Sequence, residues 1–94
     1  MNINRETKPQ LHSTRVLLKL LFRVQIAGLY RLVEQFGGEN LAVRLDQIVR
    51  DTAQLRNWSI RIEHGLIHNM RTDLSWRDYS AVMGEALSFA ITAE

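Results

Sequence analysis

The chain has 94 residues, of which 46% are hydrophobic and 23% charged, and its net charge is +2. This balance is typical of one small folded domain, and it excludes a disordered polar chain and a strongly basic nucleic-acid binder. Cysteine is absent, which excludes disulfides and thiolate metal sites.

The first predicted helix covers residues 14–36 and follows a flexible, polar arm of residues 1–12. Ser13 or Thr14 can cap its N-terminus, because both residue types accept free backbone N–H groups there. Gly37-Gly38 ends it, because glycine readily adopts the left-handed conformation that closes a helix.

Apolar residues recur at helical spacing along two sides of this first helix. The line expected in the core comprises Leu18, Phe22, Gln25, Leu29, Leu32 and Phe36. The line on the other side comprises Val16, Leu17, Leu20, Val24 and Ala27. A helix that is apolar on both sides is expected to be covered on both sides.

A second, longer helix is predicted over residues 40–70. One apolar line keeps the alternating four- and three-residue spacing of a coiled coil throughout this range. The weakest part of the prediction is Asn57-Trp58-Ser59, where a break would fall. The main line comprises Leu41, Leu45, Ile48, Thr52, Leu55, Ser59, Ile62 and Leu66, and beside it lie Ala42, Val49, Ala53, Ile60 and Ile67.

A third helix is predicted over residues 76–91. Ser75 and Asp78 match a capping box, in which each side chain binds the free backbone N–H of the other residue. The fold class expected from these elements is all-α. Residues 13–94 would form a single antiparallel three-helix bundle with a long central helix, completed by homodimerisation.

The two longer helices carry more apolar surface than the short third helix can cover. Exposed apolar surface costs about 25 cal/mol per Å², so we expect a second copy or another protein to cover it. Large aromatic side chains are often central to such contacts. The predicted interface comprises Leu17, Leu20, Leu21, Val24, Val49, Trp58, Ile60, Ile67 and Trp76.

The chain offers little catalytic or metal-binding chemistry. His64 and His68 are four residues apart, beside Glu63, but the letters EHGLIH do not match the metalloprotease pattern HExxH and no third ligand is evident. The serines have no glycine elbow, and there is no phosphate loop. We therefore expect no enzymatic activity, no cofactor and no bound metal.

Targeting signals are also not evident. The N-terminus does not resemble a secretory signal, and no segment reaches the ~18 apolar residues of a membrane span. We therefore expect a cytoplasmic protein. The first helix has a basic line and a wide apolar face that would suit a membrane surface, but we expect that face to be needed for the core.

The function predicted from these features is that of a small bacterial regulatory protein that binds other proteins. In size and helical make-up the chain is similar to the small antiactivators that bind quorum-sensing regulators. The resemblance covers general build only and transfers no residue roles. The hypothesis drawn from the apolar faces is a homodimer that could occlude the dimer interface of a transcription factor such as a quorum-sensing regulator.

The alternative is a small dimeric DNA-associated transcriptional regulator, for which the helix bearing Arg15, Lys19, Arg23 and Arg31 would supply phosphate contacts. The low net charge and the lack of a polar reading helix argue against it.

Overall fold

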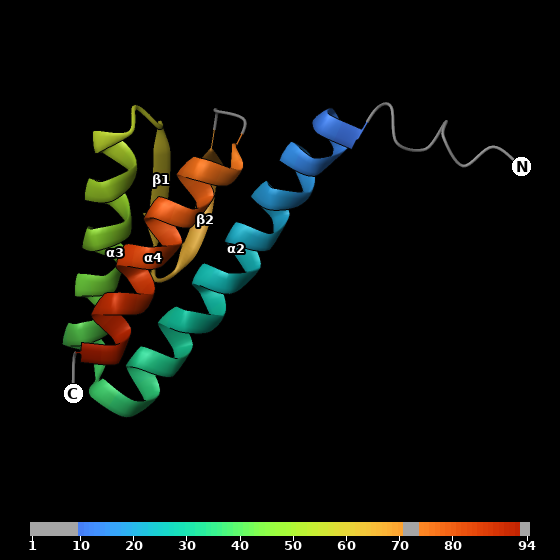
Figure 1. Cartoon of the computed structure of the whole chain (residues 1–94). Helices are drawn as coiled ribbons and strands as arrows, with labels where there is room; N and C mark the ends of the chain where they lie inside the picture. Colours follow the sequence, from blue (N-terminus) through green and yellow to red (C-terminus); the bar gives the residue numbers. More distant parts are fainter. Residues whose placement is uncertain (1–9, 71–73, 93–94) are drawn as a thin grey trace, which may run out of the picture.

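The computed structural model describes residues 10–70 and 74–92, with side chains from residue 15 onward. The prediction of an all-α bundle with a central helix over residues 40–70 is wrong, because the second half of that range forms an antiparallel hairpin. The elements in chain order are α2 (Gln10–Gly37), α3 (Glu39–Leu55), β1 (Ile60–Glu63), β2 (Leu66–Met70) and α4 (Trp76–Thr92), as Figure 1 shows.

The two ends of α2 differ in how well they were predicted. α2 already begins at Gln10, so neither Ser13 nor Thr14 is its N-cap. The rest of the predicted arm, residues 1–9, lies outside the described residues. α2 ends at Gly37, and Gly38 follows with a φ of 91°, which glycine adopts without steric cost.

The C-terminus of α3 is closed by Asn57 and Trp58, within the segment where a break in the predicted helix would fall. Asn57 has a φ of 63°, in the left-handed region. The N–H groups of Asn57 and Trp58 donate to the carbonyl oxygens of Gln54 and Ala53 at 3.0 and 2.9 Å. This is the Schellman arrangement, in which asparagine can replace glycine. Trp58 is then buried, edge-on to Phe22 at 5.5 Å between ring centroids.

The hairpin turns at His64 and Gly65, whose φ angles are 52° and 77°. Positive φ at both central residues is the signature of a type I′ turn, whose twist matches that of the flanking strands. Gly65 also lies so close to α2 that a Cβ would meet the Tyr30 Cβ at 2.4 Å. The turn is therefore fixed by both local conformation and packing.

A bulge in β2 allows the hairpin to bury one face. The register changes between Arg61 and Ile62, which leaves His68 without a partner in β1. Without the extra residue, Ile67 and Met70 would point to opposite faces, because strand side chains alternate. Both are buried, so the bulge directs both side chains into the core.

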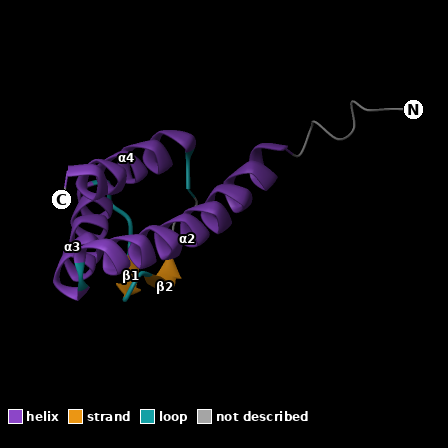
Figure 2. Cartoon of the chain, turned by 90° about the horizontal axis from the view of Figure 1, so that it is seen from below, coloured by secondary structure: helices purple, strands orange, loops and turns teal. Residues whose placement is uncertain are grey.

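The elements pack in layers. α2 and α3 form the middle, with α4 on one side of them and the hairpin on the other (Figures 1 and 2). α2 is about 42 Å long, whereas α3 and α4 are about 26 Å each, so its N-terminal turns, before Leu18, extend past its neighbours (Figure 2). The fully buried large side chains are Phe22, Ile26, Leu45, Val49, Leu74 and Val82.

The core side of α2 follows the period of a straight helix. The buried residues on this side are Leu18, Phe22, Ile26, Tyr30 and Val33. The predicted core line is wrong from Gln25 onward, since Gln25, Leu32 and Phe36 are exposed and Leu29 is only partly buried. The buried line advances by four residues at each step from Leu18 to Tyr30, whereas the predicted line takes a three-residue step to Gln25 and leaves the buried side there.

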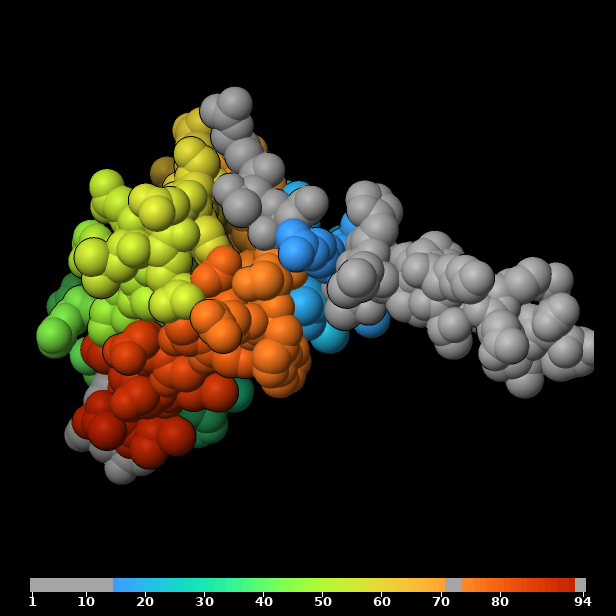
Figure 3. Space-filling model, turned by 45° about the horizontal axis from the view of Figure 1, so that its top comes forward, coloured from blue at the N-terminus to red at the C-terminus, as the bar shows by residue number. Residues whose placement is uncertain are grey.

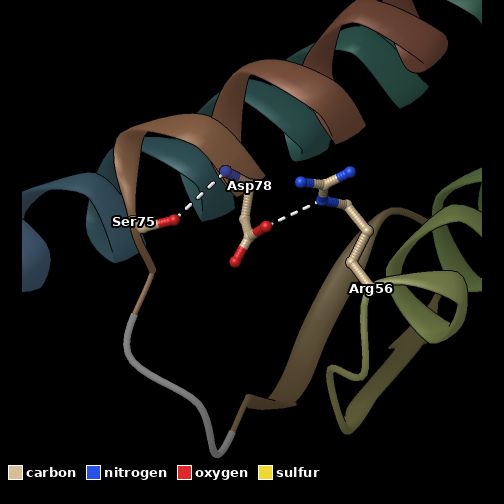
Figure 4. A network of polar contacts seen from close by, with 3 residues as sticks. All are labelled: Arg56, Ser75 and Asp78. Atoms are coloured by element: carbon tan, nitrogen blue, oxygen red, sulfur yellow. Dashed lines mark hydrogen bonds and ion pairs between the residues drawn. The ribbon is translucent and has the colours of Figure 1, made fainter.

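The start of α4 is tied to the end of α3. The Ser75 Oγ accepts the N–H of Asp78 at 3.2 Å, as expected for an N-cap. The Asp78 carboxylate accepts the Arg56 Nε–H at 2.7 Å (Figure 4). This bond from Arg56 lowers the pKa of Asp78 below its ordinary value. The acid of the predicted capping box thus joins two helices.

Candidate functional site: two apolar surfaces

The side of α2 that faces away from the core carries a second apolar surface, which we call the outer face. On a helix that advances about 100° per residue, its centre lies opposite the buried line. Exposed apolar patches of this kind are typical of binding sites. The outer face comprises Val16, Leu17, Leu20, Leu21 and Val24, with exposed fractions between 39% and 69%.

Cations border the outer face. Lys19 and Arg23 lie along one edge, and Arg31 lies on the line of the face beyond its apolar part. The only acid in the α2 sequence is Glu34, one turn after Arg31. Within the described part of the chain, no ion pair involves these cations. The outer face is therefore apolar at its centre and basic at its margin.

A second apolar surface lies near the opposite end of α2. It is an open groove of about 630 Å³, which we call the α2–α4 groove. Phe36 and Ile91 are 80% and 71% exposed and stand beside it. This surface was not predicted, because the spacing of Leu29, Leu32 and Phe36 in the sequence assigns them to the core. The lining residues are Leu29, Leu32, Val33, Phe36, Gly37, Leu41, Leu87, Ala90 and Ile91.

The structure divides the predicted interface residues between surface and core. Leu17, Leu20, Leu21 and Val24 lie together on the outer face. The residues from the predicted central helix are not available to a partner, because they lie in the core or pack against it. Val49, Trp58 and Ile67 are buried, and Ile60 is partly buried against them.

Trp76, the remaining predicted interface residue, is 68% exposed at the start of α4. Its ring stacks on Tyr79 with 5.6 Å between centroids. Tyr79 in turn lies edge-on to Phe22 and donates a hydrogen bond to the Gln25 side chain of α2. In Figure 3 the start of α4 (orange) adjoins the first described part of α2 (blue). Trp76 thus marks the junction of these helices.

An open pocket of about 260 Å³ lies at the surface between α3 and β1. Asp46 lies in it, is only 5% exposed, and accepts the Gly65 N–H at 2.9 Å. Burial raises the pKa of Asp46, although the N–H groups of Gly65 and His64 and the charge of Arg50 oppose this effect. Because its carboxylate holds the hairpin turn, we assign Asp46 a structural role.

The histidines considered as metal ligands lie on the hairpin. His64 is in the turn, and the Nε2 of His68 lies 3.8 Å from the Glu63 Oε1. Among the residues that the structure describes, no group of three or more His, Cys, Asp or Glu side chains is placed to hold a metal ion.

Comparison with known proteins adds no functional information. The chain matches no protein-family model, no curated protein and no solved structure. None of the helices within the described ranges is both long and apolar enough to cross a membrane.

Proposed function

We propose that this chain is a small cytoplasmic regulatory protein that binds another protein through the outer face and a second copy of itself through the α2–α4 groove. The observation that carries the proposal is that α2 is apolar on the side opposite its buried line. Large aliphatic side chains in water favour association, because burying them releases about 25 cal/mol per Å².

The groove suits self-association because its lining has no charged side chain. A two-fold interface places the same patch of both copies together, so a charged patch would repel itself. Phe36 and Ile91 project beside a hollow that each copy also offers. In the proposed dimer, Phe36 or Ile91 of each copy would fill the groove of the other, and this contact would bury no charge.

The regulatory use that we propose is competitive. Transcription factors often dimerise through apolar helix faces, such as those of leucine zippers. A chain that offers the outer face could cover such a helix and keep the factor from pairing. The support for this step is the chemistry of the outer face together with the small size of the chain.

Affinity capture with a matched pair of variants tests the proposal. Leu20→Ser alters the outer face, whereas Leu55→Ser alters an exposed leucine (85%) at the end of α3. We expect wild type and Leu55→Ser to retain a DNA-binding regulator that Leu20→Ser releases, and we expect added chain to dissociate the dimer of that regulator. Identical captured sets for both variants would refute the proposal.

The same preparations separate this function from the DNA-associated alternative. Affinity for DNA through arginines falls steeply as salt increases, whereas an apolar protein contact changes little. We expect no retardation of random duplex DNA at physiological salt. If the wild-type chain retards DNA, and Arg23→Glu abolishes this retardation while Leu20→Ser does not, the DNA-associated alternative is favoured.

A further inference from the structure

We propose that the occupant of the outer face is an acidic amphipathic helix of another protein, with apolar side chains at heptad spacing and carboxylates beside them. This inference rests on the proposed function and specifies the chemistry of the partner. It excludes a second copy of this chain and a lipid surface as the occupant.

Spacing along α2 suits a helix. Leu17, Leu20 or Leu21, and Val24 follow the three- and four-residue steps that interlock with a second helix. The line then continues through Ala27 and Gly28, and a Cβ built at Gly28 would meet no atom within 4 Å. Small residues on a contact line let two helix backbones approach closely. A lipid surface gains nothing from such a gap.

The cations of α2 determine which charge a docking helix should carry. Arg31 comes next on the same line, so an occupant that extends past Gly28 meets a cation. Lys19 and Arg23 border the face on one edge. Carboxylates on the docking helix would pair with these groups, whereas lysines or arginines would be repelled.

A second copy fits the outer face poorly. In an antiparallel pair centred on Val24, Arg31 would lie over Leu17 of the other copy and lose its water without gaining a carboxylate. In a pair centred between Leu20 and Leu21, the basic edges of the two copies would come together. Glu34 is too near the end of α2 to neutralise either arrangement.

The test uses the full chain and a fluorescein-labelled peptide of about three heptads, the length at which a coiled-coil pattern becomes distinct. The acidic probe carries leucine at the heptad core positions and glutamate at the flanking positions. A second peptide replaces every glutamate by lysine, and a third replaces every leucine of the acidic probe by serine. Fluorescence anisotropy at physiological salt gives each Kd.

We expect the acidic probe to bind at least about tenfold more tightly than the lysine peptide, which corresponds to about 1.4 kcal/mol. The serine peptide should not bind. The double variant Arg23→Glu, Arg31→Glu should invert the preference, and both positions are exposed, so folding should be retained. Gly28→Leu should weaken binding at least about tenfold by blocking close approach, whereas Gly84→Leu, at an open position in α4, should not.

Three results would overturn the inference: no binding of the acidic probe, equal Kd values for the acidic and lysine peptides, or unchanged binding by Gly28→Leu. A fourth is wild-type binding to vesicles of phosphatidylglycerol and phosphatidylcholine that Leu20→Ser abolishes, which would assign the face to a membrane. The proposed function fails separately, when Leu20→Ser and Leu55→Ser capture the same proteins.

Discussion

Asp46 and Gly65 are joined by a hydrogen bond of 2.9 Å from the Gly65 N–H to the Asp46 Oδ1. This bond holds the hairpin turn against α3, across a separation of 19 residues. Both groups are buried, so the loss of either would leave a polar group without a partner in the interior.

Asp46→Ala should lower the free energy of unfolding by about 1–3 kcal/mol, because it leaves the Gly65 N–H unsatisfied. Asp46→Asn keeps an oxygen acceptor and serves as the control. Burial raises the pKa of Asp46 in the folded state, so its contribution is most favourable at low pH and is lost as pH rises through the raised pKa. Urea unfolding should therefore show that the free energy of unfolding of Asp46→Asn rises relative to that of wild type between pH 3 and pH 7. A constant difference would contradict this.

Gly65→Ala should destabilise the chain by more than about 1 kcal/mol, because the φ of 77° is unfavourable for alanine and the new Cβ would collide with Tyr30. Gly84→Ala is the matched control. It lies in α4 with open space around its Cβ position, so it should stabilise by about 0.5–1 kcal/mol. Thermal unfolding followed by circular dichroism would measure the change in Tm for both variants. Equal changes in Tm would contradict the strained and closely packed position of Gly65.

Asp78→Asn should cost about 1 kcal/mol at pH 7, since the bond to Arg56 is only partly shielded from water. The pKa of folded Asp78 is lowered, so the pair stabilises above the ordinary pKa and is lost as pH falls through the lowered value. The gap between wild type and Asp78→Asn should therefore shrink at pH 3. Ser75→Ala, which removes the neutral cap, should cost about 0.5–2 kcal/mol at both pH values.

Leu45→Ala and Leu20→Ala should differ in their effect on the free energy of unfolding, because Leu45 lies in the core and Leu20 on the outer face. Leu45 is fully buried, so its truncation should cost about 2–5 kcal/mol. Leu20 is 55% exposed, and truncation there should change the free energy of unfolding by less than about 0.5 kcal/mol. Urea titrations of both variants would measure the difference. A large cost at Leu20 would mean that the outer face is already covered within the purified protein.

Light scattering on the purified chain should give the mass of a homodimer. Phe36→Glu should convert it to a monomer, because a charge beside the α2–α4 groove would be buried without a partner. Val24→Glu, on the outer face, should leave the dimer intact. A wild-type monomer at high concentration, or a dimer broken by Val24→Glu alone, would disprove the assignment of the groove to self-association.

Most helical parts of the fold could be predicted from the sequence, because their signals are local. Gly37-Gly38 marks the end of α2, and Ser75 marks the start of α4. The hairpin was not predicted, because the helical spacing of leucine and isoleucine in α3 continues in the sequence to Leu66. His64-Gly65 is not the common Asn-Gly or Asp-Gly turn pair, and the residues that contact this turn, Tyr30 and Asp46, are remote in sequence.

The candidate surfaces were partly predictable, because the residues along one side of a helix follow from local spacing in the sequence. The line of Val16, Leu20 and Val24 follows from helical period, and the structure places it in water. The α2–α4 groove depends on how far α4 covers Leu32 and Phe36, which the spacing of residues along one helix cannot show. That these surfaces bind proteins stays a prediction.

The overhang of α2 has a consequence for how recognition could be measured. Arg15, Val16 and Leu17 are exposed, and Leu18 is the first buried side chain described in α2. The turn formed by these three residues therefore depends on its own backbone bonds, and a helical segment that short is marginal in water by itself. A ligand seated on Val16 and Leu17 would supply packing at this turn. Amide hydrogen exchange at this turn should slow as a larger fraction of the outer face is occupied by ligand. The exchange rate would therefore report binding without any added label.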